Sequence, residues 1–263
     1  MIEEYVKDQE YDTHYSTLNN LRRQIAKKLP VESGMCLLDL ATGYGFFAIE
    51  VAKAYAGVRI TGVDISQSCI ENAGKNVERE GFQKCITIVK MDATHMSFSD
   101  SQFDMAFNFA GLEDIHMTRG EAGVAKVFRE IYRVLKTDSY FAFVVMPPEE
   151  METEAQKIEV NLYSYICGAT WLSAARYRDI LEMAGFKLKG RKDYYTGKKL
   201  TPEQAMVEIR FACESVPEIY GIKTPSFEQV WRRFGSQIEK NGLGQHSKIL
   251  LMTAYKAEPN QSL

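Results

Sequence analysis

One stretch near the N-terminus constrains the fold of this chain more than any other. Residues 36–40 form a short, almost wholly apolar run, as expected for a strand buried on both faces of a parallel sheet. Residues 42–45, with the sequence T-G-Y-G, then make a tight turn, and helical periodicity begins at Phe46. A strand, a glycine turn and a helix N-terminus bring unpaired backbone N–H groups close to a ligand. The stretch therefore predicts a doubly wound α/β domain with a ligand site at this turn.

The glycines of this turn fit two cofactor-binding patterns. Gly43 and Gly45, followed by Ala48, satisfy the loose dinucleotide fingerprint G-x-G-x-x-G/A, and Asp64 follows at about the expected ~20-residue distance. An NAD-dependent oxidoreductase is therefore one alternative. Asp39 favours another, because a carboxylate at the end of the strand would repel a pyrophosphate and attract a cationic amino-acid group.

The run D-L-A-T-G-Y-G, which begins at Asp39, resembles motif I of the class I S-adenosylmethionine (SAM)-dependent methyltransferases. Ala41 stands where that motif has its first glycine. Two later blocks resemble the family at the corresponding spacing. They are Asp64, at the end of a strand expected over 58–63, and the run M-D-A-T-H-M-S-F-S-D-S-Q-F-D from Met91. The set is specific because each of its acids falls at the end of a predicted strand.

The resemblance implies a SAM-binding site and assigns residues to it. Asp39 and Gly43 would contact the methionine end of SAM, and Asp64 would accept hydrogen bonds from the ribose hydroxyls. Asp92 and the backbone N–H of Ala93 would bind the adenine ring. The complete set of implied cofactor-binding residues is Asp39, Ala41, Gly43, Gly45, Asp64, Ile65, Asp92, Ala93, Asn108, Phe109 and Tyr11.

The end of the predicted fourth strand is where the resemblance places the reacting methyl group, beside Asn108 and Phe109. The segment that follows, G-L-E-D-I-H-M, holds the candidates for a general base. His116 titrates near neutrality, and a carboxylate such as Glu113 can orient it. Glu113 and Asp114 also suit the first turn of a helix, and His116 also suits an exposed surface, so both interpretations stay open.

The remaining patterns predict a seven-stranded, mostly parallel sheet with helices on both faces, the Rossmann-like fold of the resembled family. Besides the first unit, strands are expected over 58–63, 86–89, 105–109, 140–146 and 248–255, and from about 185. Helices are expected over 13–29, 118–136 and 152–168, and after the N-cap residues Ser66 and Ser173. The resemblance places the last strand antiparallel between the fifth and the sixth.

The predicted elements divide the chain into three parts. Residues 1–33 would form a cap with one helix, residues 34–190 and 248–257 the SAM-binding core, and residues 191–247 a helical insertion. Thr201-Pro202 and Thr224-Pro225 each predict an N-cap followed by proline at the first helical position. The second helix of the insertion has an apolar stripe that must be buried: Phe227, Val230, Trp231, Phe234 and Ile238. A substrate lid, a homodimer interface and packing on the sheet edge are the three alternatives.

Composition narrows the classes of function. The net charge of −3 argues against broad nucleic-acid binding, which usually requires a basic domain. No run approaches the ~18 apolar residues of a membrane span, and the charged N-terminus M-I-E-E-Y-V-K-D does not resemble a signal peptide. The five cysteines are scattered without a C-x-x-C pair, which favours free thiols over metal ligation. We therefore expect a cytoplasmic protein that has no metal ion and binds neither nucleic acid nor membrane.

The activity implied by the resemblance is transfer of a methyl group from SAM to a small-molecule acceptor by in-line displacement, with S-adenosylhomocysteine (SAH) as product. The run R-E-I-Y-R-V-L-K at 129–136 is very like the corresponding helix of small-molecule methyltransferases. The sequence N-F-A-G at 108–111 differs from the N-P-P-Y signature of amino-methylating nucleic-acid enzymes. Methylation of a protein side chain stays an alternative because of the long insertion, and an NAD-dependent oxidoreductase is less favoured.

Overall fold

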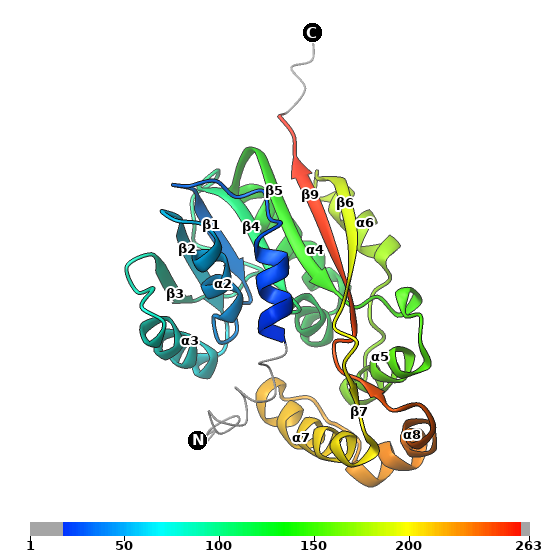
Figure 1. Ribbon diagram of the computed structural model, residues 1–263. Coiled ribbons are helices and arrows are strands. Elements are labelled where there is room, and N and C mark those ends of the chain that lie inside the picture. Colours follow the sequence, from blue (N-terminus) through cyan, green and yellow to red (C-terminus); the bar gives the residue numbers. More distant parts are fainter. Residues whose placement is uncertain (1–17, 259–263) are drawn as a thin grey trace.

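A seven-stranded sheet forms the centre of the computed structural model, which describes residues 18–258 (Figure 1). The strand order is β3-β2-β1-β4-β5-β9-β6. Their bounds are β1 Cys36–Leu40, β2 Arg59–Asp64, β3 Ile86–Lys90, β4 Phe103–Phe109, β5 Leu135–Val145, β6 Lys187–Tyr195 and β9 Lys248–Lys256. Strand β9 pairs antiparallel with both β5 and β6, and every other pair is parallel. The predicted doubly wound sheet with an inserted antiparallel last strand is therefore confirmed.

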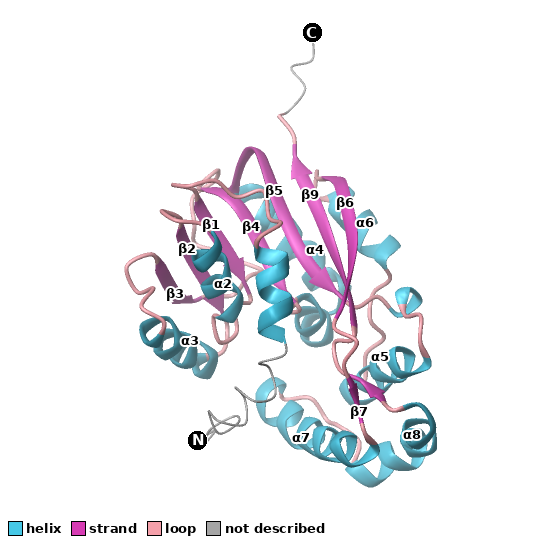
Figure 2. Cartoon of the chain, in the orientation of Figure 1, coloured by secondary structure: helices cyan, strands magenta, loops and turns pink. Residues whose placement is uncertain are grey.

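Helices cover both faces of this sheet (Figure 2). Their bounds are α2 Phe46–Ala54, α3 Gln67–Arg79, α4 Leu112–Val134, α5 Glu154–Cys167, α6 Ala174–Met183, α7 Pro202–Tyr220 and α8 Phe227–Asn241. Residues 18–26 are also helical, and the rest of the predicted 13–29 helix up to residue 17, with Tyr11 before it, lies outside the described residues.

The alternation of side chains along the strands separates two hydrophobic cores. Leu37 on β1 belongs to the core beneath the 18–26 helix, α2 and α3. Its neighbour Leu38 belongs to the core beneath α4 and α6, because successive side chains of a strand point to opposite faces. Both faces of β1 are buried, as the apolar run predicted.

Helix α4 differs from the prediction at its beginning. It starts at Leu112, six residues before the expected 118, and contains one non-helical residue, Gly120, with φ 64° and ψ −175°. Gly120 puts the two segments out of phase, so the helical periodicity of the sequence is continuous only beyond this glycine. Glu113, Asp114 and His116 therefore lie on a short first helical segment rather than in a loop.

The insertion also corrects two expectations. The N-cap of α8 is Ser226, not Thr224, because Ser226 and Gln229 form a reciprocal capping box. The Thr224 hydroxyl instead donates to the Cys213 carbonyl at 2.9 Å. Two very short strands, β7 (Lys199–Leu200) and β8 (Leu243–Gly244), pair antiparallel and join the two ends of the insertion.

Helices α5, α7 and α8 share a third hydrophobic core. The α8 stripe packs into it, with Val230, Phe234 and Ile238 buried against Ile158 and Leu162 of α5. Figure 1 shows the three helices grouped beyond the carboxyl ends of the parallel strands. We call α5, α7 and α8 the helical module. Helix α5 thus packs with the insertion, although the sequence placed it in the core.

No helix among residues 18–258 is both long and apolar enough to cross a membrane.

Candidate functional site

The turn after β1 has the backbone shape that its glycines predict. Ala41, Gly43 and Gly45 have φ values of 48°, 53° and 76°. Only glycine adopts this left-handed region without strain, so Ala41 is strained at the position where the family motif has its first glycine. The Thr42 N–H donates to the Val63 carbonyl at 2.9 Å, which holds the turn against the end of β2.

Asp64 ends β2 and faces this turn. Its carboxylate accepts hydrogen bonds from the N–H groups of Gly43 and Ser66, both at 2.9 Å. The Ile65 N–H also acts on this carboxylate. The three N–H groups use up to three of about four acceptor positions, so at least one remains for a hydroxyl donor such as that of a ribose. Ile65, the next residue, is 57% exposed, so its side chain is accessible to a ligand beside Asp64.

Asp39 is the most deeply buried acid of the turn, with 1% exposure. The Thr42 hydroxyl donates to it at 2.5 Å. Burial raises its pKa to about 7, against the opposing effect of the Thr42 hydrogen bond, and the charge of Asp64 raises the pKa further. A cationic ammonium group at this place would favour the ionised form of Asp39, which fits the amino-acid end of SAM.

Asp92 follows β3 and is held from two sides. Oδ1 accepts hydrogen bonds from the N–H and the hydroxyl of Thr94, at 2.9 and 2.8 Å. Oδ2 forms an ion pair of 2.7 Å with Arg119. Partial burial raises the pKa of Asp92, but the Thr94 hydrogen bonds and the Arg119 charge outweigh this and hold it below its usual value. Ala93, between Asp92 and Thr94, is partly buried.

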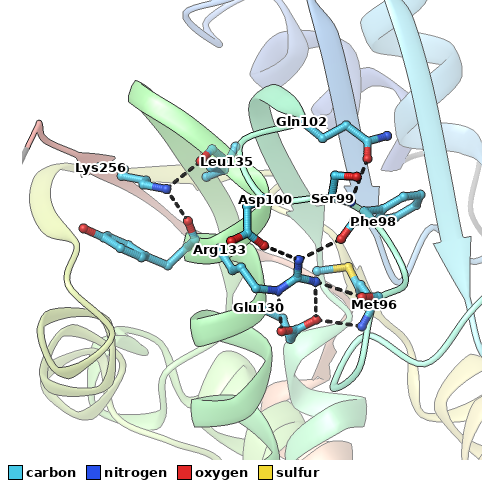
Figure 3. A network of polar contacts seen from close by, with 10 residues as sticks. Met96, Phe98, Ser99, Asp100, Gln102, Glu130, Arg133, Leu135 and Lys256 are labelled. Atoms are coloured by element: carbon cyan, nitrogen blue, oxygen red, sulfur yellow. Dashed lines mark hydrogen bonds and ion pairs between the residues drawn. The ribbon is translucent and has the colours of Figure 1, made fainter.

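An arginine clamp fixes the loop that continues from Asp92 (Figure 3). Arg133 of α4 donates to the carbonyls of Met96 and Phe98, at 2.8 and 2.7 Å. It also pairs with Glu130 and Asp100, at 2.9 and 2.8 Å. The R-E-I-Y-R-V-L-K run therefore has a structural role beside the site that its resemblance to the family did not reveal.

Asn108 lies at the end of β4 and is fully buried. Its amide donates to the Leu40 carbonyl at 2.6 Å and accepts from the Gly111 N–H at 3.2 Å. These bonds tie the end of β1 to the start of α4, which gives the side chain a structural role. Phe109 contacts Phe47, with ring centroids 5.2 Å apart, and the Arg22 guanidinium lies 4.9 Å from its ring centroid.

The base candidates on α4 have different surroundings. Glu113 is buried and accepts a hydrogen bond from the Met146 N–H at 2.9 Å, so it anchors the end of β5. Burial raises its pKa to about 7. His116 has a buried Nδ1 without a partner among the described residues, and burial lowers its pKa.

Asp114 forms a contact that sequence reasoning missed. It is half-buried, and burial raises its pKa to about 7. The Tyr220 side chain, at the end of α7, donates a hydrogen bond to it. The charge of Asp64 also acts on Asp114, so this acid lies between the expected ribose site and the helical module. No local signal links two residues so distant in the sequence.

Among residues 18–258, no group of three or more His, Cys, Asp and Glu side chains is arranged to hold a metal ion.

The fold and these residues together define a class of protein. The sheet order, the strained glycine turn and the carboxylates at the ends of β1, β2 and β3 are the arrangement expected of a SAM-dependent enzyme with a Rossmann-like fold. Comparison with known proteins agrees. The methyltransferase domain family matches residues 38–143.

Three proteins illustrate the similarity. The chain is 29% identical over 202 residues to demethylmenaquinone methyltransferase of Lactobacillus johnsonii, covering 66% of this chain and 80% of that protein. It is 25% identical to 27-O-demethylrifamycin SV methyltransferase of Amycolatopsis mediterranei, covering 95% and 88%. The solved structure of geranyl diphosphate methyltransferase in complex with SAM has a TM-score of 0.58 at 13% identity, covering 97% of this chain and 93% of that one. The last similarity shows the fold alone.

The chain therefore carries a methyltransferase domain of the class I, SAM-dependent type. Several further curated methyltransferases match it over about half of their own length or less.

Proposed function

We propose that this enzyme transfers the methyl group of SAM to a small-molecule acceptor by in-line displacement, with SAH as the other product. The observation that carries the proposal is the convergence of Asp39, Asp64 and Asp92 at the carboxyl ends of three adjacent strands. Each acid would meet a different part of one extended ligand: the ammonium group, the ribose and the adenine ring. A SAM site requires both backbone N–H groups and carboxylates to bind these groups of the ligand.

The cofactor supplies an electrophilic methyl group, and the chain's own residues hold and align it. Asp39 would bind the ammonium, Gly43 would allow close approach of the backbone, and Asp64 would hold the ribose hydroxyls. Ile65 would cover one face of the adenine ring. Alignment of donor and acceptor with exclusion of water supplies most of the rate enhancement in such a reaction.

The acceptor would approach between the first segment of α4 and the helical module. Asp114 and Tyr220 meet there, and His116 lies on the same segment. An acceptor hydroxyl loses its proton when it is methylated, and a group with a pKa near neutrality is suited to take that proton. His116 is the preferred base, and Asp114 lies on the same helical segment. Glu113 would have a structural role, because its carboxylate anchors β5.

The names of the two relatives support a small organic acceptor, since they designate methyltransferases of demethylmenaquinone and of 27-O-demethylrifamycin SV. The helical module, linked to the first segment of α4 by the Tyr220–Asp114 hydrogen bond, would cover the acceptor side of the site. We propose that the module selects the acceptor.

Calorimetric titration with SAH, with NADH in parallel, tests the cofactor site. We expect one-to-one binding of SAH alone, and loss of most affinity in Asp64→Ala. The control is Asp193→Ala, which lies in β6, the edge strand at the other end of the sheet from β2 and β3. Transfer of labelled methyl from SAM to a panel of phenols, hydroquinones and macrocyclic alcohols, with bulk protein as a competing acceptor, then tests the acceptor class. Labelling of protein alone would overturn the small-molecule proposal.

A further inference from the structure

The acid expected to bind adenine is paired with an arginine that no family motif assigns. We propose that Arg119 is a positioning residue of the adenine subsite, which fixes Asp92 so that one acceptor position remains for a 6-amino purine. This inference rests on the proposed function, because it concerns how the same site recognises its cofactor.

The hydrogen bonds around Asp92 carry the first part of the argument. An ionised carboxylate has about four acceptor positions. Thr94 occupies two positions on Oδ1 with its N–H and its hydroxyl, at 2.9 and 2.8 Å. Arg119 occupies one position on Oδ2 with Nη2 at 2.7 Å. One position on Oδ2 is left, and it suits a donor such as the exocyclic amino group of adenine.

Two glycines in the backbone of α4 determine the position of Arg119. Gly120, with φ 64° and ψ −175°, interrupts the helix directly after Arg119. A Cβ atom added to Gly123 would lie 2.4 Å from the Cβ of Arg119. Side chains at either position would therefore move Arg119, for two independent reasons. A loose surface ion pair would not need this arrangement.

The charges near Asp92 favour the same ligand group. Arg119 reaches it from α4, and His95 acts on it from its own loop. Both favour the ionised carboxylate, which accepts hydrogen bonds and cannot donate one. A purine with a 6-oxo group would place a second acceptor against the carboxylate. Arg119 thereby makes the subsite selective for adenine over hypoxanthine.

The experiment compares two ligands by calorimetry: SAH, and S-inosylhomocysteine, in which oxygen replaces the 6-amino group. We expect the wild-type protein to bind SAH at least about tenfold more tightly. Arg119→Met should weaken SAH binding about three- to tenfold and reduce the SAH preference, because Asp92 loses its fixed orientation. Arg119→Lys should retain part of the preference. Arg129→Met, at an exposed position of the same helix, is the control.

A second variant tests the role of Arg119 without replacing the arginine itself. Gly123→Ala keeps the arginine but displaces it, and we expect the preference to fall in the same direction. Circular dichroism and thermal unfolding check that each variant is folded. An unchanged ratio of the two affinities in both Arg119→Met and Gly123→Ala, with Asp92→Asn reducing it, would overturn the role of Arg119 and leave the proposed function intact. Failure of the wild-type protein to bind SAH would overturn both.

Discussion

Replacement of Arg133 by methionine is the perturbation whose magnitude the structure defines best. Methionine keeps much of the side-chain length but removes every hydrogen bond of the guanidinium. The lost partners are the carbonyls of Met96 and Phe98 and the carboxylates of Glu130 and Asp100 (Figure 3). The loop after β3, which carries Asp92, would lose these bonds to α4 and keep the Asp92–Arg119 ion pair and the hydrogen bond from the Met96 N–H to Glu130.

The energetic cost follows from the exposure of each partner. The Asp100 side chain is 77% exposed, so its ion pair contributes little. The Glu130 side chain is 21% exposed and the Arg133 side chain 31%, so we assign their pair about 0.5–1 kcal/mol. Each carbonyl bond contributes about 1 kcal/mol. The expected loss is therefore about 2–3 kcal/mol, or about 4–10 °C in Tm.

Urea unfolding and calorimetry measure this loss, with Arg129→Met as the matched control on the exposed side of α4. Arg133→Lys should recover less than half of it, because one ammonium cannot replace the several bonds of a planar guanidinium. SAH affinity should fall together with stability, since the loop holds Asp92. A change in the free energy of unfolding below about 0.5 kcal/mol, equal to that of the control, would refute the clamp.

Three further predictions concern the turn and the acceptor side. Asp39 has a pKa of about 7 in the folded protein and releases its proton at lower pH when unfolded, so its contribution to stability falls as pH rises from about 4 to 7. Asp39→Asn should flatten that part of the pH profile, and it should also reduce the proton release on SAH binding at pH 6, measured by calorimetry in two buffers. Gly111→Ala should destabilise the protein by about 1–3 kcal/mol in urea unfolding, because its new Cβ would lie 2.7 Å from the Cβ of Ala41. Asp114→Asn and Tyr220→Phe should leave SAH affinity within about twofold and lower methyl transfer, and a large loss of SAH binding would place them in the cofactor site instead.

Much of this protein could be predicted from local sequence. The β1 strand and its turn could be predicted because an apolar run, the glycines and Asp39 are contiguous in the sequence. The acids at the ends of β2 and β3 were readable because parallel strands bring their carboxyl ends to one edge of a sheet. Capping residues fixed the starts of several helices, such as Thr201 for α7. The position of the last strand, antiparallel between the fifth and the sixth, came from the resemblance, and the structure confirms it.

Other features depended on contacts between distant segments. Thr224-Pro225 looked like a helix start, but Ser226 forms the capping box with Gln229. The early start of α4 was hidden because Gly120 shifts the helical phase.

The sequence by itself determined the sheet, the glycine turn and the set of acids, because each depends on neighbouring residues or on strand ends. Only the tertiary structure decided which side chains pair with the acids of the site. The pairs Asp92–Arg119 and Asp114–Tyr220 join segments far apart in the chain. The grouping of α5 with the insertion likewise arises from burial of apolar stripes, which can be satisfied by any complementary surface. Hydrophobic burial is non-directional, so its partners are chosen only when the whole chain packs.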